Sequence, residues 1–149
     1  MVTARISHKE IGWNTPKNLF DELDREFHFV LDAAANDLNH KCVYYYTAED
    51  DGLSQPWDVL RGAVFCNPPY GRILKKWVQK AYEESTKGTT VVMLIPARTD
   101  VSWFHDIVLP HAEIRFIRGR VRYTDDYGNP VGGSAPFPSM IVIFKGVKQ

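Results

Sequence analysis

The chain has 149 residues, a length at which about 70% of the unfolded surface can be buried on folding, which favours one domain with a single core. The 18 Lys and Arg side chains balance 18 Asp and Glu side chains, and 44% of residues are hydrophobic, which excludes a disordered or strongly basic chain. A nucleic-acid partner would therefore have to be held by a local patch of charge.

Cysteine content and the first 25 residues both bear on location. Cys42 and Cys66 form no Cys-x-x-Cys pair and have no His at zinc-ligand spacing, so we expect neither a disulfide framework nor a bound metal. Residues 1–25 carry charges throughout and lack the apolar core of a signal peptide, and no apolar run approaches the ~20 residues of a membrane span. The sequence predicts a cytoplasmic protein.

The first half of the chain predicts one helix and three short strands. A helix is expected over residues 16–26, because Thr15 is a good N-cap, Pro16 suits the first helical position, and apolar residues follow at helical spacing. β-Prone apolar runs at 27–32, 43–47 and 63–66 predict strands. Asp32 ends the first strand, and an acidic turn at 49–52 follows the second.

The second half predicts two helices and three strands. An amphipathic helix begins after the turn at 67–71 and stops before Gly88. The run at 89–95 is β-branched and nearly all apolar, which is typical of a buried strand. A helix at 101–109 and strands at 113–117 and 140–144 complete the pattern.

Strands that alternate with helices indicate an α/β fold with a mostly parallel twisted sheet and helices on both faces. We expect a single domain over residues 1–149, with its core at about 13–145 and a mobile loop at the Gly/Pro-rich segment 124–138. Parallel sheets bind ligands beyond the carboxyl ends of their strands, near the switch point of the topology. Asp32 and the segments 49–52, 67–71 and 97–100 should therefore share one edge.

The quartet Asn67-Pro68-Pro69-Tyr70 carries the clearest chemical signal. Each proline fixes φ at about −65° and lacks a backbone N–H, so the turn is a rigid platform of hydrogen-bond acceptors. The side-chain carbonyl of Asn67 and the main-chain carbonyl of Pro68 can both accept from one exocyclic NH₂ group. The ring of Tyr70 can stack on the planar heterocycle that carries this amine.

The quartet resembles the NPPY motif of amino-methyltransferases that use S-adenosylmethionine, and the wider chain is similar to the phage-encoded DNA N6-adenine methyltransferase family, often called Dam. The similarity spans roughly residues 13–145. Its motifs are Trp13-x-Thr15-Pro16-x-x-Leu19-Phe20, Leu31-Asp32-Ala33-Ala34-Ala35, Glu49-Asp50-Asp51-Gly52-Leu53 with Trp57, Cys66-Asn67-Pro68-Pro69-Tyr70-Gly71, Pro96-Ala97-Arg98-Thr99-Asp100, Trp103-Phe104-His105, Arg118-Gly119-Arg120 and Ala135-Pro136-Phe137-Pro138-Ser139.

This resemblance implies a Rossmann-like fold and methylation of adenine N6 in DNA by S-adenosylmethionine, by base flipping and direct in-line transfer, without a metal. Asn67, Pro68, Pro69 and Tyr70 would form the catalytic site. The cofactor-binding residues that the resemblance implies are Thr15, Pro16, Asp32, Ala33 and Asp51. Many methyltransferases have a glycine-rich loop where this chain has Ala33, so the turn after the first strand must differ in conformation.

A DNA substrate requires groups that hold phosphates around the flipped base. In an extended segment, alternate side chains share a side, so one side would carry three arginines and the other Val121 and Tyr123. The predicted DNA-binding residues are Arg72, Arg98, Arg118, Arg120 and Arg122. We expect duplex DNA as the partner, and the sequence leaves the oligomeric state open.

Other interpretations stay open for several of these features. The proline-rich turn can be purely structural, Asp32 can simply stabilise a turn, and Lys75, Lys76 and Lys80 can be solvated residues of a helix surface. The amine can belong to RNA or to a protein glutamine, or the chain can be a non-catalytic nucleic-acid-binding module. The family resemblance favours a phage or prophage enzyme that protects DNA from host restriction.

Overall fold

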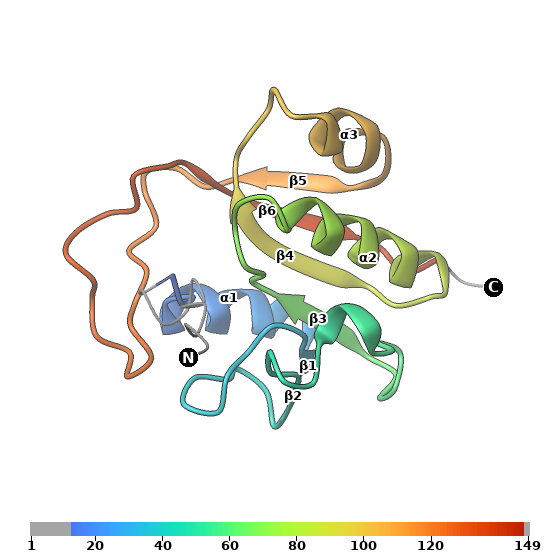
Figure 1. The fold of residues 1–149 in the computed structure, drawn as a ribbon, viewed down its shortest axis with the longest axis horizontal. Coiled ribbons are helices and arrows are strands. Elements are labelled where there is room, and N and C mark those ends of the chain that lie inside the picture. Colours follow the sequence, from blue (N-terminus) through green and yellow to red (C-terminus); the bar gives the residue numbers. More distant parts are fainter. Residues whose placement is uncertain (1–12, 148–149) are drawn as a thin grey trace, which may run out of the picture.

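The computed structural model describes residues 13–147. The prediction about a signal peptide concerns residues 1–25, of which residues 1–12 lie outside the described range. Six strands form one sheet in the order β2-β1-β3-β4-β6-β5 (Figure 1). The strands are β1 (Phe29–Asp32), β2 (Tyr44–Tyr45), β3 (Ala63–Cys66), β4 (Val91–Pro96), β5 (Glu113–Phe116) and β6 (Ser139–Phe144). Within the described residues, β6 runs opposite to the other five strands, which confirms a mostly parallel sheet.

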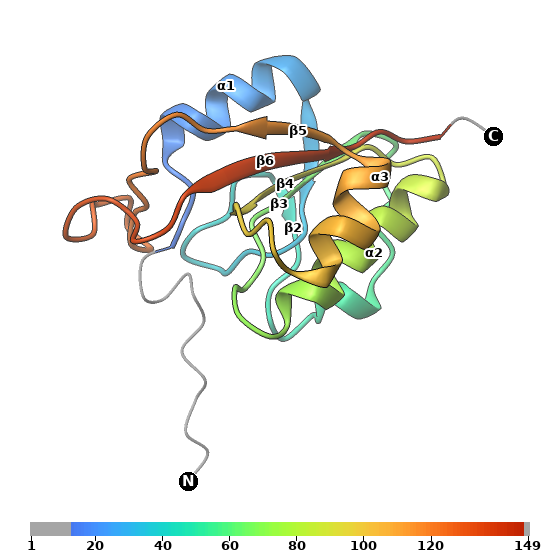
Figure 2. The same ribbon diagram turned by 90° about the horizontal axis from the view of Figure 1, so that it is seen from above.

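Helices cover both faces of the sheet, as expected (Figure 2). Helix α1 (Lys17–Phe27) packs on one face. Helix α2 (Leu74–Thr86), the π-helical turn η2 (Phe104–Val108) and the short helix α3 (Leu109–His111) pack on the other. The fold is therefore the predicted α/β arrangement, consistent with a Rossmann-like methyltransferase.

Strand β4 divides the core between these two layers. Val91, Met93 and Ile95 belong to the apolar cluster under α2, whereas Val92 and Leu94 belong to the cluster under α1. All six β4 residues are buried. Because each large apolar side chain contributes about 1.5–3 kcal/mol when fully buried, this strand anchors both layers.

Two local expectations differ from the structure. Thr15 does not cap α1, because Pro16 occupies the cap position and the Thr15 hydroxyl accepts a hydrogen bond from Asn67 instead. The expected helix at 101–109 contains the π-helical turn η2 and ends in α3. Pro110 lies in this segment and has no N–H to donate to the preceding turn, which disfavours a regular α-helical ladder there.

The topology changes direction at β1, which pairs with β2 on one side and β3 on the other. The segment after β1 stays in contact with both neighbours: the Ala33 N–H donates to the Phe65 carbonyl at 3.0 Å, and the Ala35 N–H donates to the Tyr46 carbonyl at 2.8 Å. The carboxyl ends of β1 and β3 therefore meet at one edge, where such sheets bind ligands.

The long segment 124–138 projects from this same edge (Figures 1 and 2). Thr124 forms bridges with Asn14 and with Pro130, and the Ala135 N–H donates to the Val121 carbonyl at 3.0 Å. The segment thus folds back on the chain that precedes it. Within residues 13–147, no helix is both long enough and apolar enough to cross a membrane.

Candidate active site

The turn Asn67-Pro68-Pro69-Tyr70 follows β3 directly, as predicted. Asn67 is fully buried, and its side-chain amide donates to the Trp13 carbonyl at 2.8 Å and to the Thr15 hydroxyl at 3.1 Å. These bonds tie the turn to the segment that precedes α1. They also bring Thr15, a predicted cofactor-binding residue, against a predicted catalytic residue.

The contacts of Asn67 determine which way its amide faces. The Trp13 carbonyl can only accept, so the NH₂ group of Asn67 must point towards it. The amide oxygen then faces Tyr70, whose hydroxyl donates to it at 2.6 Å. A carbonyl oxygen has two lone pairs, and the Tyr70 proton uses one of them.

The Tyr70 hydroxyl lies in a cluster of polar atoms. Its oxygen is 3.2 Å from the Leu94 carbonyl and 3.2 Å from the hydroxyl of Tyr123, which in turn lies 3.0 Å from the hydroxyl of Ser139. Burial raises the pKa of Tyr70 well above its usual range, and the neighbouring Tyr123 adds to the effect. Tyr70 therefore keeps its proton as a donor at neutral pH.

Aromatic rings surround Tyr70 on the same edge of the sheet. Phe137 meets the Tyr70 ring edge to face at 5.7 Å, and Trp13 lies 5.4 Å from Phe137. Tyr123 contacts all three rings and is itself buried. Trp13, Tyr70 and Phe137 remain partly exposed, so the proline-rich turn borders an accessible aromatic surface.

The carboxylate of Asp32 organises the segment after β1. Asp32 is fully buried, and its two oxygens accept the backbone N–H of Lys41 at 2.9 Å and that of Ala34 at 3.4 Å. The turn-stabilising interpretation of Asp32 is therefore correct for its side chain. A direct contact between Asp32 and a cofactor stays a prediction.

The acidic turn lies against this same segment. A Cβ atom on Gly52 would be 2.4 Å from the carbonyl oxygen of Ala33, closer than atoms can approach. Asp51, which precedes Gly52, has a left-handed φ of 57°, and its exposed carboxylate accepts from the Ser54 hydroxyl at 2.5 Å. The predicted cofactor residues Ala33 and Asp51 thus lie on neighbouring loops.

The buried carboxylate of Glu84, on helix α2, supports the acidic turn through Trp57. Glu84 accepts the backbone N–H of Trp57 at 2.9 Å, and the indole N–H of Trp57 donates to the Gly52 carbonyl at 2.8 Å. Lys80 and Lys87 lie 3.1 and 3.4 Å from the two Glu84 oxygens. The carboxylate is fully buried but well supplied with positive partners.

Asp126 joins the long segment 124–138 to the rest of this edge. One of its carboxylate oxygens accepts from the side-chain amides of Asn14 and Asn36, each at 3.0 Å. Asn36 belongs to the loop after β1, so the segment 124–138 and the loop that follows Asp32 and Ala33 are tied together through one carboxylate.

The arginine face is present only in part, because the segment bends at Arg118 and Gly119, where Gly119 has a φ of 78°, and the predicted alternation holds from Arg120 to Tyr123. Val121 and Tyr123 are buried, whereas Arg118, Arg120 and Arg122 are exposed. Arg115 does not share this face, because its guanidinium pairs with both carboxylate oxygens of Glu26, at 2.6 and 2.7 Å, and with Glu113. These contacts join β5 to α1.

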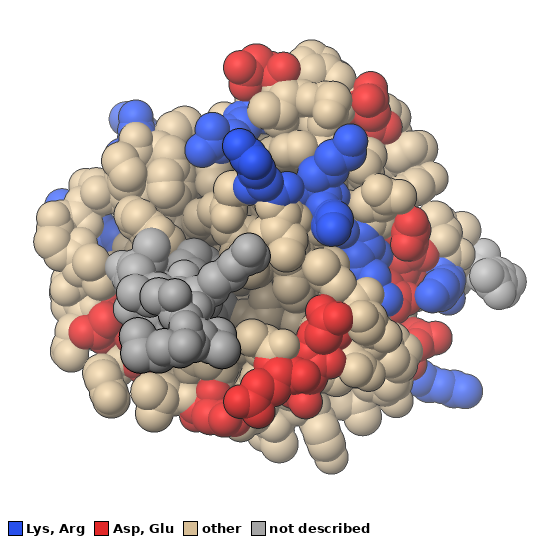
Figure 3. All heavy atoms as spheres, viewed as in Figure 1, with Lys and Arg blue, Asp and Glu red and all other residues tan. Residues whose placement is uncertain are grey.

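Charges are separated around the proline-rich turn. Figure 3 shows lysines and arginines over α2 and the loop after β4, and acidic residues over the segment between β2 and β3. A hollow in the surface lies between the two bands, over the segment that joins β3 to α2. The predicted DNA-binding residues Arg72, which precedes α2, and Arg98, on the loop after β4, are exposed, and so is Asp51, between β2 and β3.

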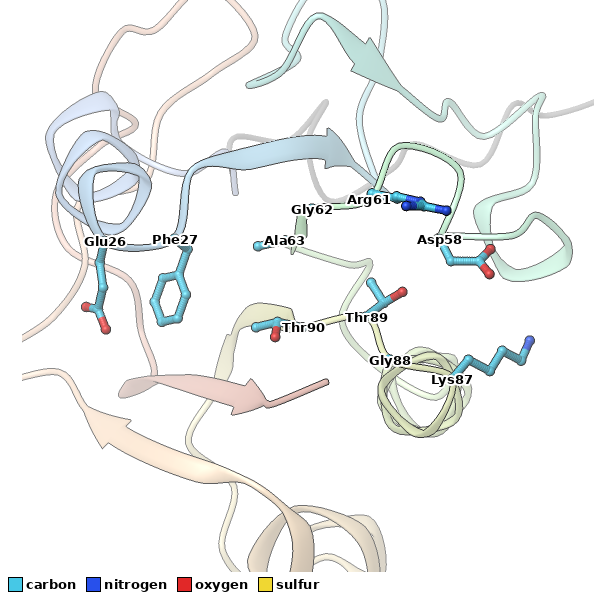
Figure 4. Close-up of a pocket in the computed structure, with 10 residues that line it drawn as sticks. All are labelled: Glu26, Phe27, Asp58, Arg61, Gly62, Ala63, Lys87, Gly88, Thr89 and Thr90. Atoms are coloured by element: carbon cyan, nitrogen blue, oxygen red, sulfur yellow. The ribbon is translucent and has the colours of Figure 1, made fainter. Parts of the chain in front are cut away.

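A separate cavity of about 590 Å³ opens at the opposite edge of the sheet. Figure 4 shows Asp58 and Arg61 on the loop before β3, and Lys87 at the end of α2. The cavity lies at the amino ends of β3 and β4, and none of the predicted site residues lines it. Among residues 13–147, no three His, Cys, Asp or Glu side chains gather as a metal site.

Tyr123, Ser139 and Glu84 contact the predicted site or its support and had no predicted role there. The alternation of residues 120–123 indicates that Tyr123 faces inward, but no local pattern indicates which side chain its hydroxyl meets. Glu84 carries a weak signal: it lies three and seven residues after Ala81 and Trp77 on the apolar side of α2, where an acidic residue is unusual.

Three comparisons with known proteins bear on this site. Residues 4–149 match the model of a family described as DNA N-6-adenine-methyltransferase (Dam). YfdM of Escherichia coli (strain K12), an inferred methyltransferase, is 46% identical over 69 residues, which are 42% of this chain and 76% of YfdM. The DNA N-6-adenine-methyltransferase of Escherichia phage T1 is 33% identical over 106 residues, which are 70% of this chain but only 44% of the phage protein.

Proposed function

Because this chain belongs to the DNA N-6-adenine-methyltransferase (Dam) family, we propose that it transfers a methyl group from S-adenosylmethionine to N6 of adenine in DNA. The family match and the phage T1 relative support a DNA adenine methyltransferase. One observation carries the proposal to a specific site: the Asn67 amide is held in one orientation by Trp13 and Tyr70, in the turn that also contains the Pro68 carbonyl.

The residues at the switch point fit a nucleoside cofactor. Ala33 and Gly52 are small and in close contact, and Asp51 supplies an exposed carboxylate that can accept from ribose hydroxyls or an adenine amine. Thr15 and Pro16 border the catalytic turn, where the methionine end would lie. When bound, S-adenosylmethionine supplies an electrophilic methyl group on a sulfonium centre.

The chemistry that we assign to the turn concerns the target amine. Asn67 Oδ1 and the Pro68 carbonyl accept hydrogen bonds from the two N6 hydrogens, which orients the nitrogen lone pair for in-line attack on the methyl carbon. With the cofactor bound, the N6 nitrogen would bond to the methyl carbon as the methyl–sulfur bond breaks, S-adenosylhomocysteine would be the leaving group, and the methylated nitrogen would release one proton to solvent. No side chain has to supply a nucleophile.

An adenine within duplex DNA must be extruded to reach this turn, at a cost of a few kcal/mol. The partly exposed Tyr70 ring provides a stacking surface for the extruded base. The exposed residues that we assign to phosphate contacts are Arg72, Arg98, Arg118, Arg120 and Arg122.

The deciding experiment is methyl transfer from labelled S-adenosylmethionine to duplex DNA that lacks N6-methyladenine, with the product nucleoside identified by mass spectrometry. Wild-type protein should form N6-methyladenine, and Asn67→Ala should lower kcat far more than it lowers cofactor affinity. Asn18→Ala, an exposed asparagine on α1, is the matched control and should behave as wild type.

Other outcomes identify the alternatives. Methylation of RNA or of a protein glutamine instead of DNA would show that the substrate is a different planar amine. Cofactor binding without any methylation would indicate a non-catalytic module. A DNA substrate and two free cysteines fit action in the cytoplasm. The phage T1 relative supports a phage or prophage origin, and the biological role that we propose is to mark DNA against host restriction.

A further inference from the structure

Three hydroxyl groups from distant parts of the chain form a line of hydrogen bonds that ends at the amide oxygen of Asn67. Ser139 lies at the start of β6, Tyr123 follows the arginine face, and Tyr70 closes the proline-rich turn. Their oxygens are 3.0 Å apart between Ser139 and Tyr123, and 3.2 Å apart between Tyr123 and Tyr70. The line continues over 2.6 Å from Tyr70 to the Asn67 amide oxygen.

The donor and the acceptor of each hydrogen bond along this line can be assigned by starting from Tyr70. Tyr70 has one proton, and its nearby carbonyl oxygens, those of Asn67 and Leu94, can only accept. Tyr70 therefore donates to a carbonyl, and its own oxygen accepts the proton of Tyr123. By the same reasoning Tyr123 accepts from the hydroxyl of Ser139.

We propose that Tyr123 is a positioning residue for methyl transfer: its hydroxyl, held by Ser139, donates to Tyr70 and thereby keeps the Tyr70 proton on Asn67. This inference rests on the proposed function. A hydroxyl that accepts a hydrogen bond is a stronger donor, so the line strengthens the bond from Tyr70 to Asn67. The Asn67 oxygen is then held in a fixed direction for the target amine.

The surroundings of Tyr123 suit a positioning role. Its side chain is fully buried and is wedged among the rings of Trp13, Tyr70 and Phe137 at centroid distances of 5.7, 6.4 and 5.9 Å. The packing fixes the ring in place whether or not the hydroxyl is present. Tyr123→Phe therefore removes one oxygen atom and keeps the aromatic packing.

The test compares Tyr123→Phe, Tyr70→Phe and the double variant with wild type. Tyr123→Phe should lower kcat by about tenfold and leave the Kd for S-adenosylmethionine within about twofold of wild type. The double variant should be no slower than Tyr70→Phe alone, because Tyr123 acts through the Tyr70 hydroxyl. Tyr82→Phe, which removes the same atom from a partly buried ring on α2, is the control and should leave kcat unchanged.

Ser139→Ala provides a second variant that removes the other end of the line, and it should lower kcat by a smaller factor in the same direction. All rates are measured below the melting temperature of each variant. A wild-type kcat in Tyr123→Phe, or effects of the two Tyr→Phe changes that multiply in the double variant, would overturn the inference. Absence of N6-methyladenine from wild-type reactions would instead overturn the proposed function, and the inference with it.

Discussion

Gly52 lies so close to Ala33 that no other residue fits between their backbones: a Cβ at position 52 would be 2.4 Å from the Ala33 carbonyl oxygen and 3.0 Å from the ring of Trp77. The acidic turn and the loop after β1 are thereby held in direct contact. The Trp57 indole fixes the Gly52 carbonyl from the other side. This contact brings the carboxylate of Asp51 near the switch point.

Gly52→Ala should separate these two loops. Overpacking of a closed site costs roughly 1–3 kcal/mol, so we expect lower stability and a Kd for S-adenosylmethionine about tenfold higher, measured by calorimetry. Gly146→Ala is the control, because its Cβ would meet the Gly88 carbonyl oxygen at 2.2 Å, outside the proposed cofactor site. It should lower the melting temperature without changing the Kd; an equal Kd change in both variants would contradict a local role for Gly52.

Replacing Arg120 and Arg122 together with glutamine should weaken DNA binding and reduce its salt dependence. Each phosphate contact contributes about 0.9 to the slope of log K against log salt, so two lost contacts should lower the slope by about 2. Fluorescence anisotropy of labelled duplex DNA over a salt series measures this slope. Arg115→Gln should leave the slope unchanged and lower the melting temperature, because Arg115 pairs with Glu26.

Glu84 should contribute stability that depends on pH. Burial raises its pKa, but the Trp57 N–H and the ammonium groups of Lys80 and Lys87 outweigh burial and hold the pKa below the ordinary 4.5. A carboxylate with a lowered folded-state pKa stabilises the protein above pH 4.5, and this stability is lost as the pH falls through the folded-state pKa.

Glu84→Gln should therefore be less stable than wild type at pH 7, by about 1–3 kcal/mol. Urea unfolding at a series of pH values between 7 and 3 measures the difference. The two proteins should converge as the solution becomes acidic, because wild-type Glu84 is then protonated and no longer charged. A difference that stays constant over this range would show that the charge of Glu84 is not what stabilises the fold.

The sequence predicts most of the fold because its strands are locally distinctive. The run at 63–66 is apolar and stops at two prolines, and β3 has those same bounds. The run at 43–47 is similarly β-prone, yet β2 contains only Tyr44–Tyr45. Its partner β1 is short, and β2 lies at the edge of the sheet, so pairing ends sooner than side-chain preference suggests.

Some parts of the site can likewise be predicted from a short stretch of sequence, whereas others depend on residues far apart in the chain. The proline-rich turn is recognisable because its chemistry lies in four consecutive residues. Its contact with Thr15 forms because the fold brings these two segments together. Tyr123 meets Tyr70 across 53 residues, and Glu84 meets Trp57 across 27. Such pairings depend on how the strands are ordered in the sheet, and no pattern within a short window contains that order.

The separation of these partners along the chain also affects how the protein folds. Asn67 reaches back 54 residues to Trp13, and Asn14 reaches forward 112 residues to Asp126, so each contact closes a long loop. Because the entropy of loop closure is lost before such contacts can form, they assemble late and together with the sheet. Recovery of enzymatic activity during refolding should then coincide with the final cooperative phase, and partly folded chains should be inactive even where β3 and α2 have already formed.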